Sequence, residues 1–259
     1  MTQFTHAIAR TPGDNFDEGI TTSSSLGRPD YLDTLLQHRA YLQALKKCGL
    51  KVDLLKPDQK HPDSTFVEDT AVLTANCAIL SNPGASSRKG ELRAIRKTIE
   101  GYYAKVHSIT TPGTLDGGDI CEAGTHYFIG LSDRTNEEGG RQLAAFLAEE
   151  GFTASFVPIH DVPAILHLKS GVCYIGDNTL VVINALADHP DFKNYRLVRV
   201  DDDEAYAANC VRINDFVLLP SGYPKLQSAL EKLGYQPVLL DMSEYRKMDG
   251  GLSCLSLRF

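Results

Sequence analysis

Apolar and polar positions alternate along this chain in short segments with either a strand-like or a helix-like period. Apolar runs bounded by Gly, Pro or Asn predict strands at 6–10, 51–55 and 71–80, the last run being hairpin-like. Leucines at close to helical spacing predict a helix from about 30 to 48, and Gly49 supplies its end. The chain therefore begins as strand, helix, strand.

The same order of elements then recurs. Asp69 and Asp119 each precede a pair of predicted strands, a turn that contains an arginine and a predicted helix. The two predicted helices run from about 89 to 102 and from about 137 to 149, and the second strand pair covers 120–129. Weaker copies begin near His167 and Asn209, and the last of them leads into a predicted helix at 225–233.

Repeats of about 40–50 residues are typical of a closed array of similar units, as in propellers. Each unit reads strand, strand, helix, strand, which predicts an α/β array, and no linker-like stretch divides the chain. We therefore expect a single domain that spans residues 1–259. Equivalent strand ends in such an array meet at its centre, which would bring together Asp69, Asp116 or Asp119, His167, Asn209 and Cys254.

Composition and charge narrow the class of protein. The chain has 259 residues, 42% of them hydrophobic, and a formal net charge of -7, which argues against a nucleic-acid partner and suits a cationic ligand. No apolar run approaches the ~18 residues of a membrane span, and the first residues lack a signal-peptide pattern. Six cysteines without a C-x-x-C pair argue against a zinc ribbon and a small disulfide scaffold. We expect a reduced, cytoplasmic, globular protein.

The C-terminal stretch carries a candidate nucleophile. Gly250 and Gly251 allow a tight bend just before Cys254, and alternating apolar residues at 255–259 predict a short strand after it. A thiol at the start of a strand is well placed to attack a substrate. The alternative is a buried structural cysteine, which is the more common role of a free thiol.

The segment 61–69 is unusually acidic. Asp63, Glu68 and Asp69 surround the apolar Phe66 and Val67. Three carboxylates around an apolar pair are a chemically unusual combination, which makes this segment a candidate functional site. A solvated acidic loop is the alternative.

Five blocks, taken together, resemble one known group of enzymes. They are Phe-Val-Glu-Asp at 66–69, Leu-Asp-Gly-Gly-Asp at 115–119, Leu-His-Leu-Lys-Ser at 166–170, Ala-Ala-Asn-Cys at 207–210 and Asp-Gly-Gly-Leu-Ser-Cys at 249–254. In this order, over residues 6–259, they resemble the guanidino-group-modifying (pentein) superfamily, and most closely its dimethylarginine dimethylaminohydrolase family. The resemblance implies a five-fold pseudosymmetric α/β-propeller, in agreement with the repeat.

The resemblance also implies roles for individual residues. Cys254 matches the nucleophile, His167 the proton-transfer histidine, and Asp116 a carboxylate that orients the histidine or contacts the guanidinium. Many bacterial members carry Glu at the position of Asp116, and the shorter side chain changes the acid–base geometry. The matched substrate-binding positions are Ile20, Asp63, Phe66, Glu68, Asp69, Arg88, Arg134, Met248 and Ser253, with the two arginines at the amino-acid end of the substrate.

The implied reaction is hydrolysis of N-omega-methylated arginine to citrulline and dimethylamine or methylamine, through an S-alkylthiouronium on the cysteine. It needs no metal and no organic cofactor, and it belongs to arginine metabolism and nitric oxide regulation. A thiol, an imidazole and carboxylates also serve arginine and agmatine deiminases, so those activities remain alternatives, as does a non-catalytic sensor of guanidino ligands. We expect a small cationic amino acid as the substrate, no nucleic-acid or membrane partner, and a monomer or homodimer.

Overall fold

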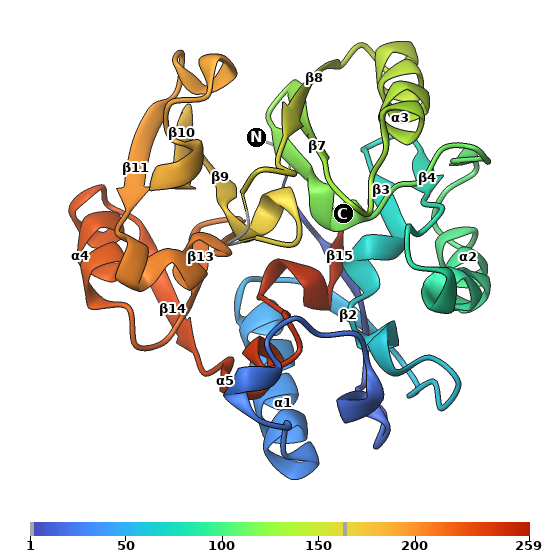
Figure 1. The fold of residues 1–259 in the computed structure, drawn as a ribbon, viewed down its shortest axis with the longest axis horizontal. Helices are drawn as coiled ribbons and strands as arrows, with labels where there is room; N and C mark the ends of the chain where they lie inside the picture. The colour runs from blue at the N-terminus through green and yellow to red at the C-terminus, as the bar shows by residue number, and fades with distance from the viewer. Residues whose placement is uncertain (1–2, 163–164) are drawn as a thin grey trace.

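Five three-stranded sheets stand around a central axis in the computed structural model, which describes residues 3–162 and 165–259 (Figure 1). In every sheet an inner strand runs antiparallel to a middle strand, which pairs in parallel with an outer strand. The strands, from inner to outer, are β3 (Ala71–Leu73), β4 (Ala78–Leu80) and β5 (Val106–Ser108); β6 (Ile120–Ala123), β7 (His126–Leu131) and β8 (Thr153–Pro158); β9 (Val172–Gly176), β10 (Thr179–Ile183) and β11 (Arg196–Val200); β12 (Val211–Ile213), β13 (Phe216–Pro220) and β14 (Gln236–Leu240); β15 (Leu257–Arg258), β1 (His6–Arg10) and β2 (Lys51–Leu55). The α/β array expected from the repeat and the five-fold arrangement implied by the resemblance are confirmed.

Helices lie on the outside of the ring (Figure 1). In the sequence, each of them connects the middle strand of its blade to the outer strand. They are α1 (Tyr31–Lys47), α2 (Leu92–Ile99), α3 (Glu137–Glu149) and α4 (Pro224–Lys232), and a short α5 (Ser243–Arg246) follows β14. The predicted unit of strand, strand, helix, strand is thus present in four blades. In the blade of β9–β11, two 3-10 turns, Asn184–Leu186 and Pro190–Phe192, take the place of the α-helix.

The helix predicted at 89–102 is shorter than expected. Residues Ser86–Glu91 form a 3-10 turn, and α2 begins only at Leu92 and ends at Ile99. The tighter turn buries the side chains of Arg88 and Glu91, which bond to each other. A polar contact inside the protein thus overrides the helical pattern of the sequence.

Both ends of the chain build one blade. The C-terminal β15 pairs antiparallel with the N-terminal β1, with Ile8 opposite Leu257, and β1 pairs in parallel with β2. The strand predicted at 255–259 is shorter than expected, because Ser253–Leu255 form a 3-10 turn ahead of it. The pairing of the two ends closes the ring of sheets.

Apolar side chains fill the space between each sheet and its helix. Leu143 and Leu147 of α3, for example, are fully buried against Tyr127 and Ile129 of β7. None of the helices in the described parts of the chain has the length and apolar character needed to cross a bilayer.

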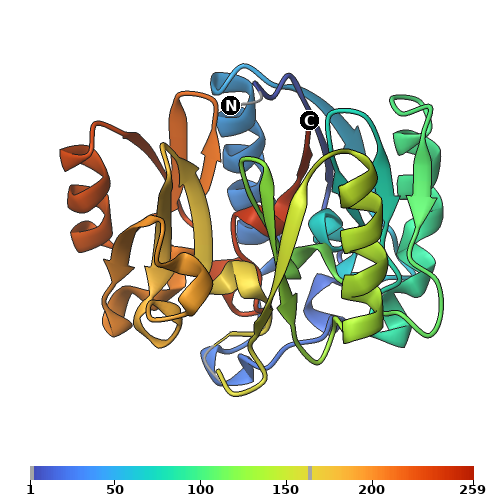
Figure 2. The same cartoon turned by 90° about the horizontal axis from the view of Figure 1, so that it is seen from above.

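Each inner strand is preceded by a short 3-10 turn. The five turns are Val67–Thr70, Gly117–Asp119, Leu168–Ser170, Asp202–Ala208 and Ser253–Leu255. Since the inner strands are neighbours around the axis, the turns form a ring at one end of it, named here the turn ring. The chain ends lie at the opposite end of the molecule (Figure 2).

Candidate active site

A small cavity of about 30 Å³, named here the front cavity, opens at the turn ring. Its lining residues come from segments far apart in the sequence: Ile20, Asp63, Phe66, Asp69, Arg88, Asp116, Arg134, Leu166, His167, Met248, Asp249, Gly250 and Cys254. The structure therefore brings together ten of the twelve residues expected at the site. Glu68 and Ser253 lie outside this lining.

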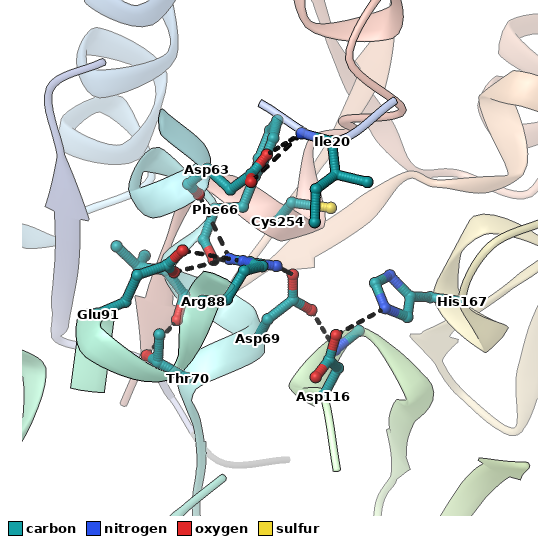
Figure 3. A network of polar contacts seen from close by, with 12 residues as sticks. Ile20, Asp63, Phe66, Asp69, Thr70, Arg88, Glu91, Asp116, His167 and Cys254 are labelled. Atoms are coloured by element: carbon teal, nitrogen blue, oxygen red, sulfur yellow. Dashed lines mark hydrogen bonds and ion pairs between the residues drawn. The ribbon is translucent and has the colours of Figure 1, made fainter. Parts of the chain in front are cut away.

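Cys254 is buried in the turn Ser253–Leu255, and its sulfur points toward the space beside Asp69 and His167 (Figure 3). The two preceding glycines are required by close contacts. A Cβ on Gly250 would lie 2.5 Å from the Phe66 ring, and one on Gly251 would lie 2.5 Å from Asn209. The sequence predicted the tight bend, and the structure supplies the reason for it.

Burial, followed by the negative charges of Glu68 and Asp69, raises the pKa of the Cys254 thiol to about 12. With the site empty, the thiol is therefore neutral near pH 7. A cation placed beside it would offset both carboxylates and favour the thiolate.

His167 lies next to Asp116, with 3.3 Å between Nε2 and Oδ2 (Figure 3). Burial alone would lower the pKa of His167, but the carboxylates of Asp69, Asp119 and Asp116 outweigh it and raise the pKa to about 9. Burial likewise acts to raise the pKa of Asp116, and the hydrogen bond and charge of His167 reverse this and lower it. His167 is thus an imidazolium near neutral pH, ready to donate a proton.

Asp69 already has a guanidinium partner from the protein. Its Oδ2 accepts from Nη1 of Arg88 at 2.5 Å, and its Oδ1 accepts from the backbone N–H of Gly118 at 2.8 Å. Arg88 is held in turn by Glu91, whose two oxygens accept from Nε at 3.0 Å and Nη2 at 2.9 Å (Figure 3). Nη2 also donates to the carbonyl oxygens of Phe66 at 3.0 Å and Asp63 at 3.3 Å. One N–H of Nη1 has no partner among the residues that the structure describes, so it could bind a ligand.

Glu91 is a site residue that the sequence reasoning missed. It is 2% exposed, and burial raises its pKa to about 6, with Arg88 acting in the opposite direction. Its position three residues after the turn arginine is the one signal that pointed to it, since such a spacing allows an ion pair.

The loop that carries Ile20 covers part of the front cavity. The backbone N–H of Ile20 donates to Oδ1 of Asp63 at 3.0 Å. Asp249 has a left-handed backbone (φ 55°), accepts from the N–H of Thr22 at 2.5 Å and also bonds the Ser23 hydroxyl. Asp249 was not expected at the site, and it fixes the loop over the cavity.

The remaining expected residues form the walls. Phe66 and Met248 are buried apolar lining residues, and Phe66 packs against Tyr245 with ring centroids 6.3 Å apart. Arg134 is half-buried at the cavity. Its backbone lies so close to Gly84 that a Cβ on Gly84 would lie 2.5 Å from the Arg134 carbonyl oxygen. Burial raises the pKa of Asp63, and Arg88 partly offsets this.

Glu68 faces the opposite side of the turn ring, toward a larger cavity of about 1080 Å³, named here the rear cavity. Its Oε1 accepts from Lys169 Nζ at 2.6 Å and from Arg258 Nη2 at 2.9 Å. The buried Oε2 has no hydrogen-bond partner among the described residues. Far from being a solvated loop, the acidic segment is buried, and Glu68 forms the wall behind Cys254.

Asp69, Asp116 and His167 have ligand atoms within 4.8 Å of one another, a spacing that suits a divalent cation. Binding a metal there through the ring of His167 would require the imidazolium to lose its proton. An organic cation could bind the carboxylates and leave that proton in place.

The fold and the site define a class before any particular family. Five α/β blades around an axis, with a cysteine, a histidine and carboxylates on the turns at one end, are the arrangement of a pentein. The family model described as "N,N dimethylarginine dimethylhydrolase, eukaryotic" matches residues 31–201. The N(G),N(G)-dimethylarginine dimethylaminohydrolase of Pseudomonas aeruginosa is 45% identical over 99% of this chain and 100% of its own. The chain belongs to the dimethylarginine dimethylaminohydrolase family.

Other relatives agree with this membership. The enzyme of the same name from Streptomyces coelicolor is 34% identical over 97% of this chain and 96% of its own. A solved structure of the Pseudomonas aeruginosa protein, a cysteine-to-serine mutant complexed with citrulline, superposes with a TM-score of 0.96 at 44% identity and covers 100% of both chains. The N-terminal domain of ArgZ, an arginine dihydrolase from Cyanobacteria, shares the fold at a TM-score of 0.88 and 20% identity over 99% of this chain and 97% of that one.

Proposed function

We propose that this protein hydrolyses the guanidinium of N-omega-methylated arginines, and releases citrulline together with dimethylamine or methylamine. The observation that carries the proposal is the front cavity itself. A neutral thiol, an imidazolium and several buried carboxylates meet there. A cationic ligand would add the positive charge that balances these carboxylates and favours the thiolate. Solved relatives with citrulline and with an S-methyl-L-thiocitrulline adduct support the same chemistry.

Binding activates the nucleophile. A substrate guanidinium beside Asp69 and Asp116 places a positive charge near the sulfur of Cys254, which lowers the pKa of the thiol. The thiolate then attacks the central guanidinium carbon, and the C–S bond forms while the carbon becomes tetrahedral.

His167 supplies the proton for the first product. The C–N bond to the methylated nitrogen breaks as that nitrogen takes the proton of the His167 imidazolium, and neutral amine leaves. The protein then carries an S-alkylthiouronium cation on Cys254, and His167 is neutral.

Water completes the reaction. His167 takes a proton from a water molecule, the resulting hydroxide adds to the same carbon, and the C–S bond breaks to release citrulline. The hydroxyl proton of the adduct is lost as the C–S bond breaks, and the sulfur takes back a proton when citrulline leaves. The neutral thiol and the imidazolium are thus restored, and one water is consumed in each turnover. Asp116 keeps the imidazole ring oriented in both half-reactions, through its hydrogen bond to Nε2.

The amino-acid end of the substrate points toward the mouth of the front cavity in this proposal. Arg134 and the one uncommitted N–H of Arg88 bind its carboxylate, and Asp63 with the Ile20 loop binds its amino group. The cavity is too small for arginine in its present form, so the Ile20 loop has to move for the substrate to enter.

The proposal includes three further expectations. The whole chain, 1–259, acts as one catalytic domain, which agrees with a blade built from both chain ends. The protein works in the cytoplasm as a monomer or homodimer, on a small amino acid. Its activity contributes to arginine metabolism and to nitric oxide regulation.

A parallel assay tests the substrate. The ureido product and the released amine or ammonia are measured from asymmetric dimethylarginine, monomethylarginine, arginine and agmatine at equal concentration. The ureido product is citrulline for the three amino acids and N-carbamoylputrescine for agmatine. We expect turnover of the methylated arginines with equal amounts of citrulline and of the methylated amine. Faster turnover of arginine, or of agmatine, would assign the protein to the deiminases instead.

A further inference from the structure

Neighbouring turns of the turn ring are joined by side chains that accept a backbone N–H from the next turn. Asp69 Oδ1 accepts from Gly118 at 2.8 Å. Asp119 Oδ1 accepts from Leu168 at 3.0 Å, directly after His167. The third residue that acts in this way is Asn209, and it is the only one of the three with a neutral side chain.

Asn209 uses its entire amide to join the turn of Cys254 to that of His167. Its Oδ1 accepts from the Ser253 N–H at 2.9 Å. Its Nδ2 donates to Ser253 Oγ at 3.1 Å and to the Lys169 carbonyl at 3.0 Å. The side chain is 4% exposed and fits where Gly251 lacks a Cβ.

The amide also sets the direction of a hydrogen bond to the sulfur. Ser253 Oγ accepts from Asn209, so its own hydrogen remains free for Cys254 Sγ, which lies 3.9 Å away. A donor at this position stabilises the thiolate relative to the thiol. A carboxylate at 209 would instead accept the Ser253 hydrogen and add a negative charge.

We infer that Asn209 is a positioning residue of the nucleophile, which fixes the Cys254 turn relative to the His167 turn and turns the Ser253 hydroxyl toward the sulfur. This inference rests on the proposed role of Cys254. Two of the three side chains, Asp119 and Asn209, then match the charge of the group beside them. A carboxylate, Asp119, lies beside the imidazolium, and a neutral amide lies beside the sulfur that must become negative.

The direct test is Asn209→Asp, which preserves shape and the acceptor for the Ser253 N–H. We expect the rate of Cys254 alkylation by neutral iodoacetamide at pH 7.5 to fall about tenfold, as for a rise of one unit in the thiol pKa. The pH profile of alkylation should move upward, and kcat should fall more than KM changes. Alkylation and kcat equal to those of the unmodified protein would overturn the inference.

Asn214→Asp is the matched control. Asn214 also bridges backbone groups, as it accepts from Phe4 N at 2.9 Å and donates to the carbonyls of Phe4 at 3.0 Å and Cys48 at 2.9 Å. We expect it to lower the melting temperature without moving the alkylation profile of Cys254. If both variants shift the alkylation profile equally, Asn209 has a purely structural role and the inference is wrong.

A double-mutant cycle tests the route through Ser253, and covers the case in which Asn209→Asp fails to fold. Asn209→Ala should slow alkylation of Cys254 severalfold when Ser253 is present. The effect should be smaller in a Ser253→Ala background, because the hydroxyl that Asn209 orients is then absent. An equal effect in both backgrounds would refute the relay. If the wild-type protein shows neither alkylation of Cys254 nor turnover, the proposed function itself is contradicted. Failure of the proposed function is therefore distinguishable from failure of the inference about Asn209.

Discussion

The front and rear cavities share one wall and differ in almost every other respect. The front cavity is about 30 Å³ and the rear cavity about 1080 Å³. Chain neighbours are divided between them, because Asp69 and Cys254 line the front whereas Glu68 and Ser253 line the rear. In the rear cavity the buried carboxylate is neutralised by Lys169, together with Arg258.

The comparison shows that incomplete charge, rather than volume, marks the reactive end of the molecule. In the front, a thiol with a pKa of about 12 faces an imidazolium with a pKa of about 9. Burial, with the charges of Glu68 and Asp69, raises the pKa of the thiol, and carboxylates led by Asp69 raise the pKa of His167 against the effect of burial. Asp69 acts on both groups, and a cationic substrate would bind it. Mutations at the front should therefore change chemistry, and mutations at the rear should not, except in the shared wall that holds Glu68 and Ser253.

The largest effect is expected for Cys254→Ser. A serine hydroxyl is far less nucleophilic than a thiolate at this position, so turnover should fall by at least about a thousandfold. Folding should be preserved, because the side chain changes by one atom. Citrulline release and thermal unfolding measure the two outcomes, and appreciable turnover would contradict the role of Cys254.

A change of pH dependence is expected for Asp116→Asn. In the wild-type protein kcat, which reports the substrate complex, should rise with pH as the thiol ionises beside the bound cation. It should fall where His167, whose pKa is raised to about 9 in the empty site, loses the proton that the leaving amine needs. Removing the Asp116 charge lowers the pKa of His167, so the falling limb should move to lower pH. The amide should cost about ten- to a hundredfold in rate at pH 8.5. A profile of unchanged shape would mean that Asp116 does not act on His167.

A smaller effect on binding is expected for Glu91→Gln. The change removes the charge that holds two N–H groups of Arg88, so Arg88 is free to compete with the substrate for Asp69. KM for dimethylarginine should rise about tenfold, equivalent to about 1.4 kcal/mol, with little change in kcat. Glu91→Asp, which keeps the charge, should restore part of the affinity. An unchanged KM would limit Glu91 to a structural role.

The smallest effect is expected for Cys173→Ser in the rear cavity. Cys173 is a half-buried free thiol that lines the rear cavity, so its substitution is the comparison for that of Cys254. Steady-state rates should stay within about twofold, since no charged group of the front cavity contacts it. A loss of activity comparable to that of Cys254→Ser would remove the distinction between the two cavities.

Much of the fold was predictable because the repeat is local. The strand at 6–10, the helix at 137–149 and the recurring order of strand, strand, helix, strand follow from period and turn signals, and the structure confirms them. The number of five units followed from the resemblance. The late start of α2 was not predictable, because it depends on the contact between Arg88 and Glu91, which forms only in the folded protein.

The site was predictable to the extent that motifs mark it. The blocks around Asp69, His167 and Cys254 place these residues at one cavity. Glu68 and Asp69 face opposite sides of the turn ring. The packing of neighbouring strands decides which side each residue faces, so the sequence alone could not assign Glu68 to the rear cavity. The roles of Glu91 and Asp249 likewise depend on partners that lie elsewhere in the sequence or in a tight turn.

The central claim is that Cys254 becomes covalently bonded to the guanidinium carbon of the substrate. The most direct measurement is mass spectrometry of His167→Gly after mixing with S-methyl-L-thiocitrulline and quenching in acid, followed by peptide mapping, because the methanethiolate of this analogue leaves without a proton from His167. Without His167 to activate water, an adduct with the mass of the S-alkylthiouronium should accumulate on the Cys254 peptide and decay slowly. An unmodified Cys254 peptide under conditions where this variant still consumes substrate, or turnover at the unmodified rate, would contradict the account.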